Sequence, residues 1–132
     1  FTLIFNANAE NVNFFDEAKN LYENEKYEDS KFLFQRNIVY NPKDSKSYLY
    51  LAKIFKNEEN KTELEKNINT VVLLEPNNEE AMYLLIDIEL ERSNFSKAEE
   101  LREDFKKICS NLCDKIASIN KRLKEFEKKD AS

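Results

Sequence analysis

The chain has 132 residues, 41% of them hydrophobic and 36% charged, so a single domain with a packed core is expected. It contains neither Gly nor His. This excludes a P-loop, a dinucleotide fingerprint and any catalytic triad or metal cluster built on His, so we expect no enzyme, no cofactor and no metal. The formal net charge of −5 argues against a nucleic-acid binder, which would carry a basic surface.

The first nine residues differ sharply from the polar sequence that follows. They read FTLIFNANA, an apolar cluster followed by the small-x-small pattern of a signal-peptidase site, with cleavage expected before Glu10. We therefore expect residues 1–9 to be the remnant of a secretory signal, and the mature protein to be periplasmic or otherwise exported. The alternative is an apolar strap that lies along the first helical hairpin. No later stretch holds 18 consecutive apolar residues, so no integral membrane span is expected.

Two proline sites divide the next hundred residues into units. Asn41-Pro42 and Glu75-Pro76 lie 34 residues apart. Pro ends a helix because it lacks an N–H and disfavours helical geometry in the residue before it. Side chains able to cap a new helix follow each site, and a chain without Gly is ill suited to β-hairpins. We therefore expect a domain over residues 10–112 made of three two-helix units, at residues 11–44, 45–78 and 79–112.

Equivalent positions of the three units share size and chemistry. The fourth position is bulky and apolar, and the eighth is small in the first two units. These residues are Phe14, Tyr48 and Met82 at the fourth position, and Ala18, Ala52 and Ile86 at the eighth. With the 34-residue period, the proline stops and the segments KYEDS (26–30) and NFSKA (94–98), they resemble the tetratricopeptide repeat (TPR) family. The resemblance implies an all-α fold, an α-α superhelix of three helical hairpins plus a C-terminal capping helix.

The apolar periodicity agrees with this reading. It predicts six helices of about 12–15 residues in the three units. On the second helix of the first unit it places Phe32, Phe34, Ile38 and Val39 on the apolar face. A chain without Gly needs another residue wherever a turn takes positive φ. We expect Asn to serve there, because it sits in most of the expected loops.

The two cysteines, Cys109 and Cys113, lie where the third unit meets the last segment. In one continuous helix the Cβ vectors of residues four apart run nearly parallel, which suits a disulfide poorly. Two close cysteines in an exported protein normally form a disulfide. We therefore expect a helix break at Ser110-Asn111 and a small disulfide-closed loop. Free thiols, a redox pair or a metal site are alternatives, although Cys-x-x-x-Cys is not the usual redox spacing and His ligands are lacking.

The segment 113–132 is expected to form one amphipathic helix and a tail. Its apolar residues, with Leu112 just before it, recur at spacings of four and three and make one stripe; they are Leu112, Ile116, Ile119, Leu123 and Phe126. A solenoid needs a terminal cap with one apolar and one polar face, and this helix fits. The alternative is a short coiled-coil seam for dimerisation, so we expect a monomer or a weak homodimer.

The TPR resemblance also implies where a partner binds. In the family the first helix of each hairpin lines the concave groove, and its second, fifth, ninth and twelfth positions contact the ligand. The partner-binding residues expected on this basis are Phe15, Lys19, Tyr22, Lys46, Leu49, Lys53, Tyr83 and Asp87. The lysines suit an acidic segment of a protein or peptide, and the aromatic residues and Leu49 supply apolar anchors.

The sequence thus predicts an adaptor for protein–protein interaction. It binds a partner peptide or helix in the groove of the array and assists assembly of an envelope complex. One alternative is a structural module that self-associates through its C-terminal helix. Another is a thiol redox protein that uses Cys109 and Cys113.

Overall fold

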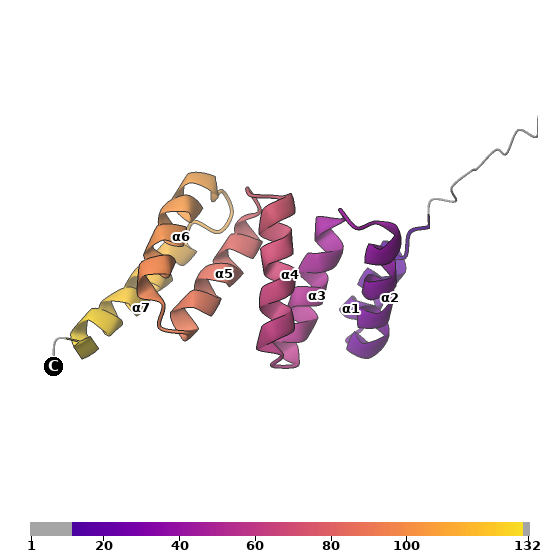
Figure 1. The fold of residues 1–132 in the computed structure, drawn as a ribbon, viewed down its shortest axis with the longest axis horizontal. Coiled ribbons are helices and arrows are strands. Elements are labelled where there is room, and N and C mark those ends of the chain that lie inside the picture. The colour runs from indigo at the N-terminus through magenta and orange to yellow at the C-terminus, as the bar shows by residue number, and fades with distance from the viewer. Residues whose placement is uncertain (1–11, 131–132) are drawn as a thin grey trace, which may run out of the picture.

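The computed structural model describes residues 12–130, and the side chains of residues 12–127. The predicted signal remnant at residues 1–9 lies outside the described residues. Residues 12–130 form seven α-helices and no strand. The helices stack in one row from α1 to α7 (Figure 1). They are α1 (Phe15–Glu23), α2 (Tyr27–Tyr40), α3 (Ser45–Asn57), α4 (Lys61–Leu74), α5 (Glu79–Glu91), α6 (Phe95–Ile108) and α7 (Lys115–Asp130).

This arrangement confirms the predicted fold class. The hairpins α1–α2, α3–α4 and α5–α6 follow one another as in a TPR-like superhelix, and α7 closes the last one. The helix α2 ends at Tyr40 and α4 ends at Leu74, each directly before its X-Pro site. The proline stops therefore separate one hairpin from the next.

The same turn joins the two helices of each hairpin. Its one left-handed residue recurs every 34 positions, at Glu25, Glu59 and Ser93, with φ of 60°, 58° and 61°. In the first turn the N–H of Lys26 donates to the Leu21 carbonyl (2.9 Å) and the N–H of Glu25 to the Tyr22 carbonyl (3.0 Å). This pair of bonds is the Schellman motif, and the other two turns repeat it. The hairpin turns are thus built without Gly.

The prediction that Asn occupies the left-handed positions was wrong. Asn instead starts helices, because its side-chain oxygen satisfies a backbone N–H that would otherwise lack a partner. Asn60 accepts from the N–H of Glu63 (3.2 Å) at the start of α4. Asn78 accepts from the N–H of Ala81 (2.9 Å) at the start of α5. The left-handed positions go to exposed Glu and Ser side chains, which meet no packing constraint there.

A buried amide ties the first hairpin to the second. Asn37 on α2 is 1% exposed. Its Oδ1 accepts from the N–H of Phe14 (2.9 Å), and its Nδ2 donates to Asp44 Oδ2 (3.0 Å) and Ser47 Oγ (2.9 Å). The hydroxyl of Ser47 also donates to Asp44 (2.6 Å). This network fixes both the entry to α1 and the start of α3.

The first helix is shorter than expected. It has 9 residues, whereas the predicted length was about 12–15. The N–H groups of Phe14 and Phe15 are bound by the side chains of Asn37 and Asn13. The preceding chain is thus held out of helical geometry, and α1 begins only at Phe15.

The helices of each hairpin touch through one large and one small side chain, or two small ones. In the first hairpin Ser30 Oγ donates to the Ala18 carbonyl (2.7 Å), which shows that positions 8 and 20 of the unit meet. The equivalent pairs are Ala52 with Leu64 and Ile86 with Ala98, and all six residues are buried. Ile86, although large for the family, is accommodated because its counterpart Ala98 is small.

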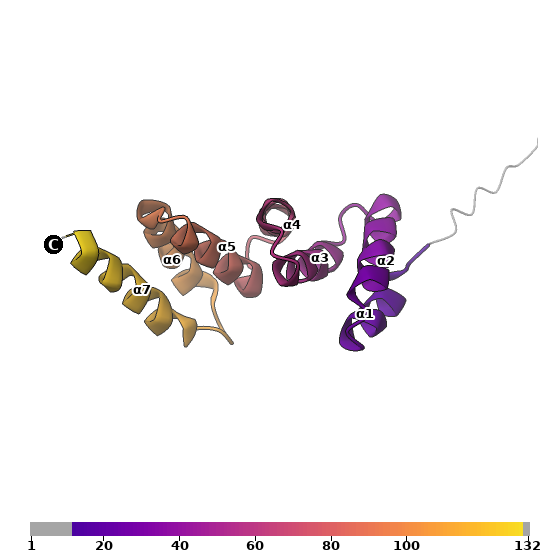
Figure 2. The ribbon, with the colours of Figure 1, turned by 90° about the horizontal axis from the view of Figure 1, so that it is seen from below.

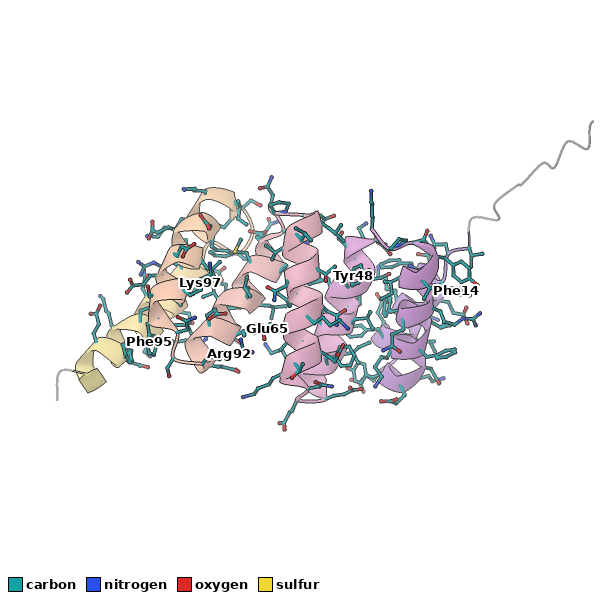
Figure 3. The ribbon with its side chains drawn as sticks, viewed as in Figure 1. Phe14, Tyr48, Glu65, Arg92, Phe95 and Lys97 are labelled. Carbon is teal, nitrogen blue, oxygen red and sulfur yellow. A yellow bond between two sulfur atoms is a disulfide. The ribbon has the colours of Figure 1, made fainter. Side chains whose placement is uncertain are left out.

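Two ion pairs between neighbouring hairpins occupy equivalent positions with reversed charge. Lys31 on α2 lies 2.6 Å from Glu58 in the α3–α4 turn. One repeat later, Glu65 on α4 is bound by Arg92 in the α5–α6 turn, with Nη1 of Arg92 2.7 Å from Glu65 Oε1 (Figure 3). The hydrogen bonds from Arg92 lower the pKa of Glu65. The reversed signs favour each hairpin's own neighbour over a misplaced one.

The predicted apolar face of α2 was wrong for two of its four residues. Phe34 is fully buried and Ile38 is half-buried, but Phe32 and Val39 are 58% and 76% exposed. The equivalent positions of α4, Lys66 and Leu73, are exposed as well, so these positions lie on the outer side of the solenoid, which no helix of residues 12–130 covers. Phe32 and Val39 lie on that outer side.

The apolar stripe of α7 packs inside the chain. Ile119 and Leu123 are 1% and 4% exposed, and Phe126 stacks on Phe95 of α6. Arg122 donates to Asp87 of α5 (2.5 Å). The helix thus acts as a cap on the third hairpin, and its stripe is not an exposed seam of the kind that a coiled-coil dimer requires.

Candidate partner-binding face

The eight predicted partner-binding residues lie on α1, α3 and α5, which we call the first-helix face. Figure 2 shows α1, α3 and α7 toward one side of the row, with α2 and α4 toward the other. Leu49 is only 9% exposed and belongs to the hydrophobic core, so it shapes this face from below. The other seven residues reach the surface, because each is half-buried or exposed. They are Phe15, Lys19, Tyr22, Lys46, Lys53, Tyr83 and Asp87.

An aromatic cluster joins α1 to α3. The ring of Tyr50 lies edge-on to Tyr22 and Phe15, with centroids 5.0 and 5.8 Å apart. It also stacks on the buried Phe34 at 5.1 Å. Burial raises the pKa of Tyr22, because desolvation disfavours the phenolate. The sequence reading missed Tyr50, which stands at the sixth position of its unit and so outside the family's contact positions.

Two lysines of the first-helix face pair with acidic residues of a neighbouring hairpin. Lys53 lies 2.7 Å from Glu80 of α5. Lys56 lies 3.8 Å from Asp87, which Arg122 of α7 also contacts. Both pairs join α3 of the second hairpin to α5 of the third. These charges therefore hold neighbouring hairpins together.

Two basic residues of the predicted set keep more freedom. Lys19 pairs only with Glu23 on its own helix, at 3.8 Å, and the two side chains are 45% and 60% exposed. Lys46 is exposed and, within residues 12–127, lies in no ion pair. An exposed i,i+4 pair contributes little to stability and is easily exchanged for another partner. Lys19 and Lys46 are therefore the lysines available to an acidic ligand.

Two hollows lie along α5. The first, of ≈ 670 Å³, lies between the start of α5 and the α6–α7 loop and is lined in part by Tyr83, Leu112 and Lys115. The second, of ≈ 620 Å³, lies between α5 and the α3–α4 turn and is lined in part by Phe55, Leu64 and Asp87. Leu84 lines both hollows. Two predicted residues, Tyr83 and Asp87, thus lie at neighbouring hollows, and each hollow is lined by both apolar and charged residues.

The α6–α7 loop forms one wall of the first hollow and has a defined conformation. Helix α6 ends at Ile108, and a disulfide joins Cys109 to Cys113. The carboxylate of Glu79 accepts from three consecutive N–H groups of this loop, those of residues 110, 111 and 112, at 2.7, 3.1 and 3.1 Å. These backbone hydrogen bonds, the one from Ser110 most of all, lower the pKa of Glu79. Glu79 went unnoticed in the sequence, where it reads as an ordinary helix start.

The part of the chain that the structure describes contains neither a metal-ligand cluster nor a membrane-spanning helix. No three His, Cys, Asp or Glu residues gather there as metal ligands would. No helix within that part is long and apolar enough to cross a membrane.

Several solved structures share this fold. The type III secretion translocator chaperone SycD of Yersinia enterocolitica matches 90% of this chain and 84% of its own, with a TM-score of 0.74 and 16% identity. The structure of SycD in complex with a peptide of the translocator YopD covers 89% of this chain and 92% of the SycD chain, with a TM-score of 0.73 and 17% identity. The structure of PcrH in complex with the chaperone-binding region of PopD covers 89% of this chain and 90% of the matched chain, with a TM-score of 0.70 and 13% identity. No protein-family model and no curated protein matches the chain. At these identities the likeness establishes the TPR-like fold alone.

Proposed function

We propose that this protein is an adaptor that binds a segment of a partner protein on its first-helix face. The observation that carries the proposal is the pair of hollows along α5, which share Leu84 and include the predicted residues Tyr83 and Asp87. Neighbouring hollows that apolar residues help to line suit a peptide or helix that inserts two side chains. In support, the structures of similar fold include chaperones in complex with segments of YopD and PopD.

The residues divide into two groups in this proposal. Tyr83 and Leu84 supply apolar contact at the hollows, and the exposed edges of Phe15 and Tyr22 extend it toward α1. Lys19 and Lys46 receive an acidic residue of the partner, because their ammonium groups are the least committed on this face. The partner segment therefore runs from an acidic part near the first two hairpins to an apolar part at α5.

The chaperone neighbours agree with the expectation that the protein is not an enzyme. In this proposal residues 10–112 form the binding array and residues 113–132 the cap and tail. The work done on a bound partner is holding and presenting it, which requires no reacting group.

The proposed place of action is outside the cytoplasm, in the assembly of an envelope complex. It rests on the signal-like residues 1–9 and on the cysteine pair, which suits an oxidising compartment. The intact mass of the protein expressed from its full reading frame tests this. We expect a mature form that starts at Glu10 and is lighter by two hydrogens. An uncleaved, fully reduced chain would contradict export.

Variants of the first-helix face test the binding function. The pure protein is immobilised, an envelope extract is passed over it, and the retained partner is then titrated against variants. Tyr83→Ala should weaken binding at least about tenfold, as truncation of a central apolar contact does. Lys46→Glu should weaken it less and make the loss salt-dependent. Leu73→Ala is the control, because Leu73 is 80% exposed on a second helix. Equal affinity for all variants would remove this face as the binding site.

A further inference from the structure

Exposed apolar residues gather on the outer side of α2. Within the described residues, four large apolar side chains are mostly exposed, and three of them lie on α2: Phe32 (58%), Val39 (76%) and Tyr40 (55%). This side belongs to the hairpin at the end of the row (Figure 1). We call it the α2 end face. It is separate from the first-helix face, which α1, α3 and α5 form.

The α2 end face is an ordered stack of side chains. The guanidinium of Arg36 lies over the ring of Phe14 (4.8 Å) and near the ring of Phe32 (5.7 Å). Phe14 in turn packs against Tyr40, with centroids 6.0 Å apart. Figure 3 shows Phe14 at the end of the row, beside α2. Contacts of this kind restrict the side chains in advance of a further contact.

The fold does not require these residues. One repeat later, Lys66 and Thr70 stand at the positions of Phe32 and Arg36. Lys66 is exposed and Thr70 is half-buried, as expected on the outer side of a solenoid. We therefore infer that Phe32, the aromatic residue at this position of the first hairpin, makes a contact with a molecule outside that hairpin. Exposed aromatic residues and Arg beside each other are characteristic of interface centres.

The charges on this face are complementary to themselves. Asp29, Phe32, Arg36 and Tyr40 follow one another at spacings of three and four, so they form one stripe along α2. Asp29 and Arg36 are two turns apart, about 10 Å along the axis, and do not meet in one helix. Neither lies in an ion pair within residues 12–127. An antiparallel copy of the same stripe, centred between Phe32 and Leu33, would bring each Arg36 to the other Asp29.

A hollow beside the stripe completes the surface. It has ≈ 300 Å³ and is lined by Leu21, Leu33 and Phe32 together with Asp29 and Glu17. The hollow lies next to the point between Phe32 and Leu33 about which the antiparallel copy is centred. It therefore provides space for the Phe32 ring of that copy. The face therefore has an apolar centre, a hollow that fits its own aromatic residue, and opposite charges at matched distances.

From these observations we propose that the α2 end face is the interface of a homodimer, in which the α2 helices of two copies pack antiparallel about a two-fold axis. Phe32 of each copy inserts at the centre, and Arg36 of each copy pairs with Asp29 of the second copy. An isologous contact of this kind is closed and stops at two copies. The dimer leaves both first-helix faces free, so it carries two partner segments at once.

Sedimentation velocity over a wide concentration range tests the dimer. The full chain should sediment as a concentration-dependent dimer. Phe32→Lys, which introduces the residue type found one repeat later, should raise the dimer dissociation constant at least about tenfold. Leu73→Lys is the matched control, because it places the same charge at a residue that is 80% exposed on α4, and it should leave the constant unchanged. A chain that stays monomeric at every concentration, or an equal effect of both variants, would overturn the proposal.

A charge exchange identifies the antiparallel arrangement. Arg36→Asp alone places like charges opposite each other and should weaken the dimer severalfold, as should Asp29→Arg. The double variant restores opposite charges across the two-fold axis and should recover most of the affinity. Circular dichroism of the monomer verifies that each variant is folded. If the double variant dimerises no better than the single ones, the antiparallel pairing is wrong, and another occupant covers this face.

Discussion

Replacing Asn37 by Ala should destabilise the protein far more than the same change at Asn67. Asn37 makes hydrogen bonds to Phe14, Asp44 and Ser47 across two hairpins, and it also accepts from Asn41 (3.1 Å). Removing the amide leaves the N–H of Phe14 and the Asp44–Ser47 pair short of partners in a buried place. Each lost bond costs about 1 kcal/mol, and water replaces part of the loss at the edges, so the total is about 2–3 kcal/mol.

Asn67 is the matched control. It is also a buried Asn on a second helix, 6% exposed. Its one hydrogen bond runs to the Glu63 carbonyl of its own helix (2.7 Å). Asn67→Ala should therefore cost about 1 kcal/mol at most.

Urea unfolding, followed by circular dichroism, measures both variants. The free energies should differ by more than about 1 kcal/mol at unchanged slope. Equal losses in the two variants would refute the reasoning, because they would mean that the bridge between the hairpins contributes nothing beyond helix packing.

Three further predictions follow from the ion pairs and the α6–α7 loop. Lys31→Glu should destabilise the fold, and adding Glu58→Lys should restore it, with a coupling of about 1 kcal/mol in a double-mutant cycle; additive losses would contradict the pairing. Replacing Cys109 and Cys113 by Ser should cost about 2 kcal/mol, the value expected for a short disulfide loop, and unfolding of the unmodified protein with and without a reductant checks this. The pKa of Glu79 is lowered in the folded state, so its stabilisation is complete above the ordinary value of 4.5 and is lost as pH falls through the folded pKa. Glu79→Gln should remove that part of the acid sensitivity, which urea midpoints taken from neutral to acid pH would show; an unchanged pH profile would refute it.

The repeat architecture was predictable because its causes are local. Pro42 and Pro76 end helices through their own covalent geometry, and their spacing gives the period directly. The small residues Ala18 and Ala52 also predict close helix packing directly, since a small side chain lets two helices approach. The amphipathic helix α7 was predictable for the same reason, because its apolar residues Ile119 and Leu123 recur at helical spacing.

What the sequence did not yield depends on contacts between distant residues. The exposure of Phe32 and Val39 follows from their place on the outer side of the solenoid, where Leu73 of α4 is exposed as well, and periodicity within one helix does not encode it. The ion pair of Lys53 with Glu80 joins two hairpins, so Lys53 looked free when its own helix was considered alone. Glu79 is a further case, because its three donors lie about thirty residues further along the chain.

The cross-hairpin pairs had a detectable signal that position-by-position reading misses. Lys31 and Glu65 are equivalent residues of opposite charge, and so are Glu58 and Arg92. Comparing units for compensating charge reversals, instead of for identity, would have revealed both pairs.

Site-specific photo-crosslinking tests the central claim most directly. A photoreactive amino acid is placed at Tyr83, at the first hollow, and in a second protein at Leu73, which is 80% exposed on α4. Irradiation in an envelope extract should join the Tyr83 variant to one protein, through one short segment of that protein, and should leave the Leu73 variant without that product. Equal crosslinking at both positions, or none at Tyr83, would contradict a partner held on the first-helix face.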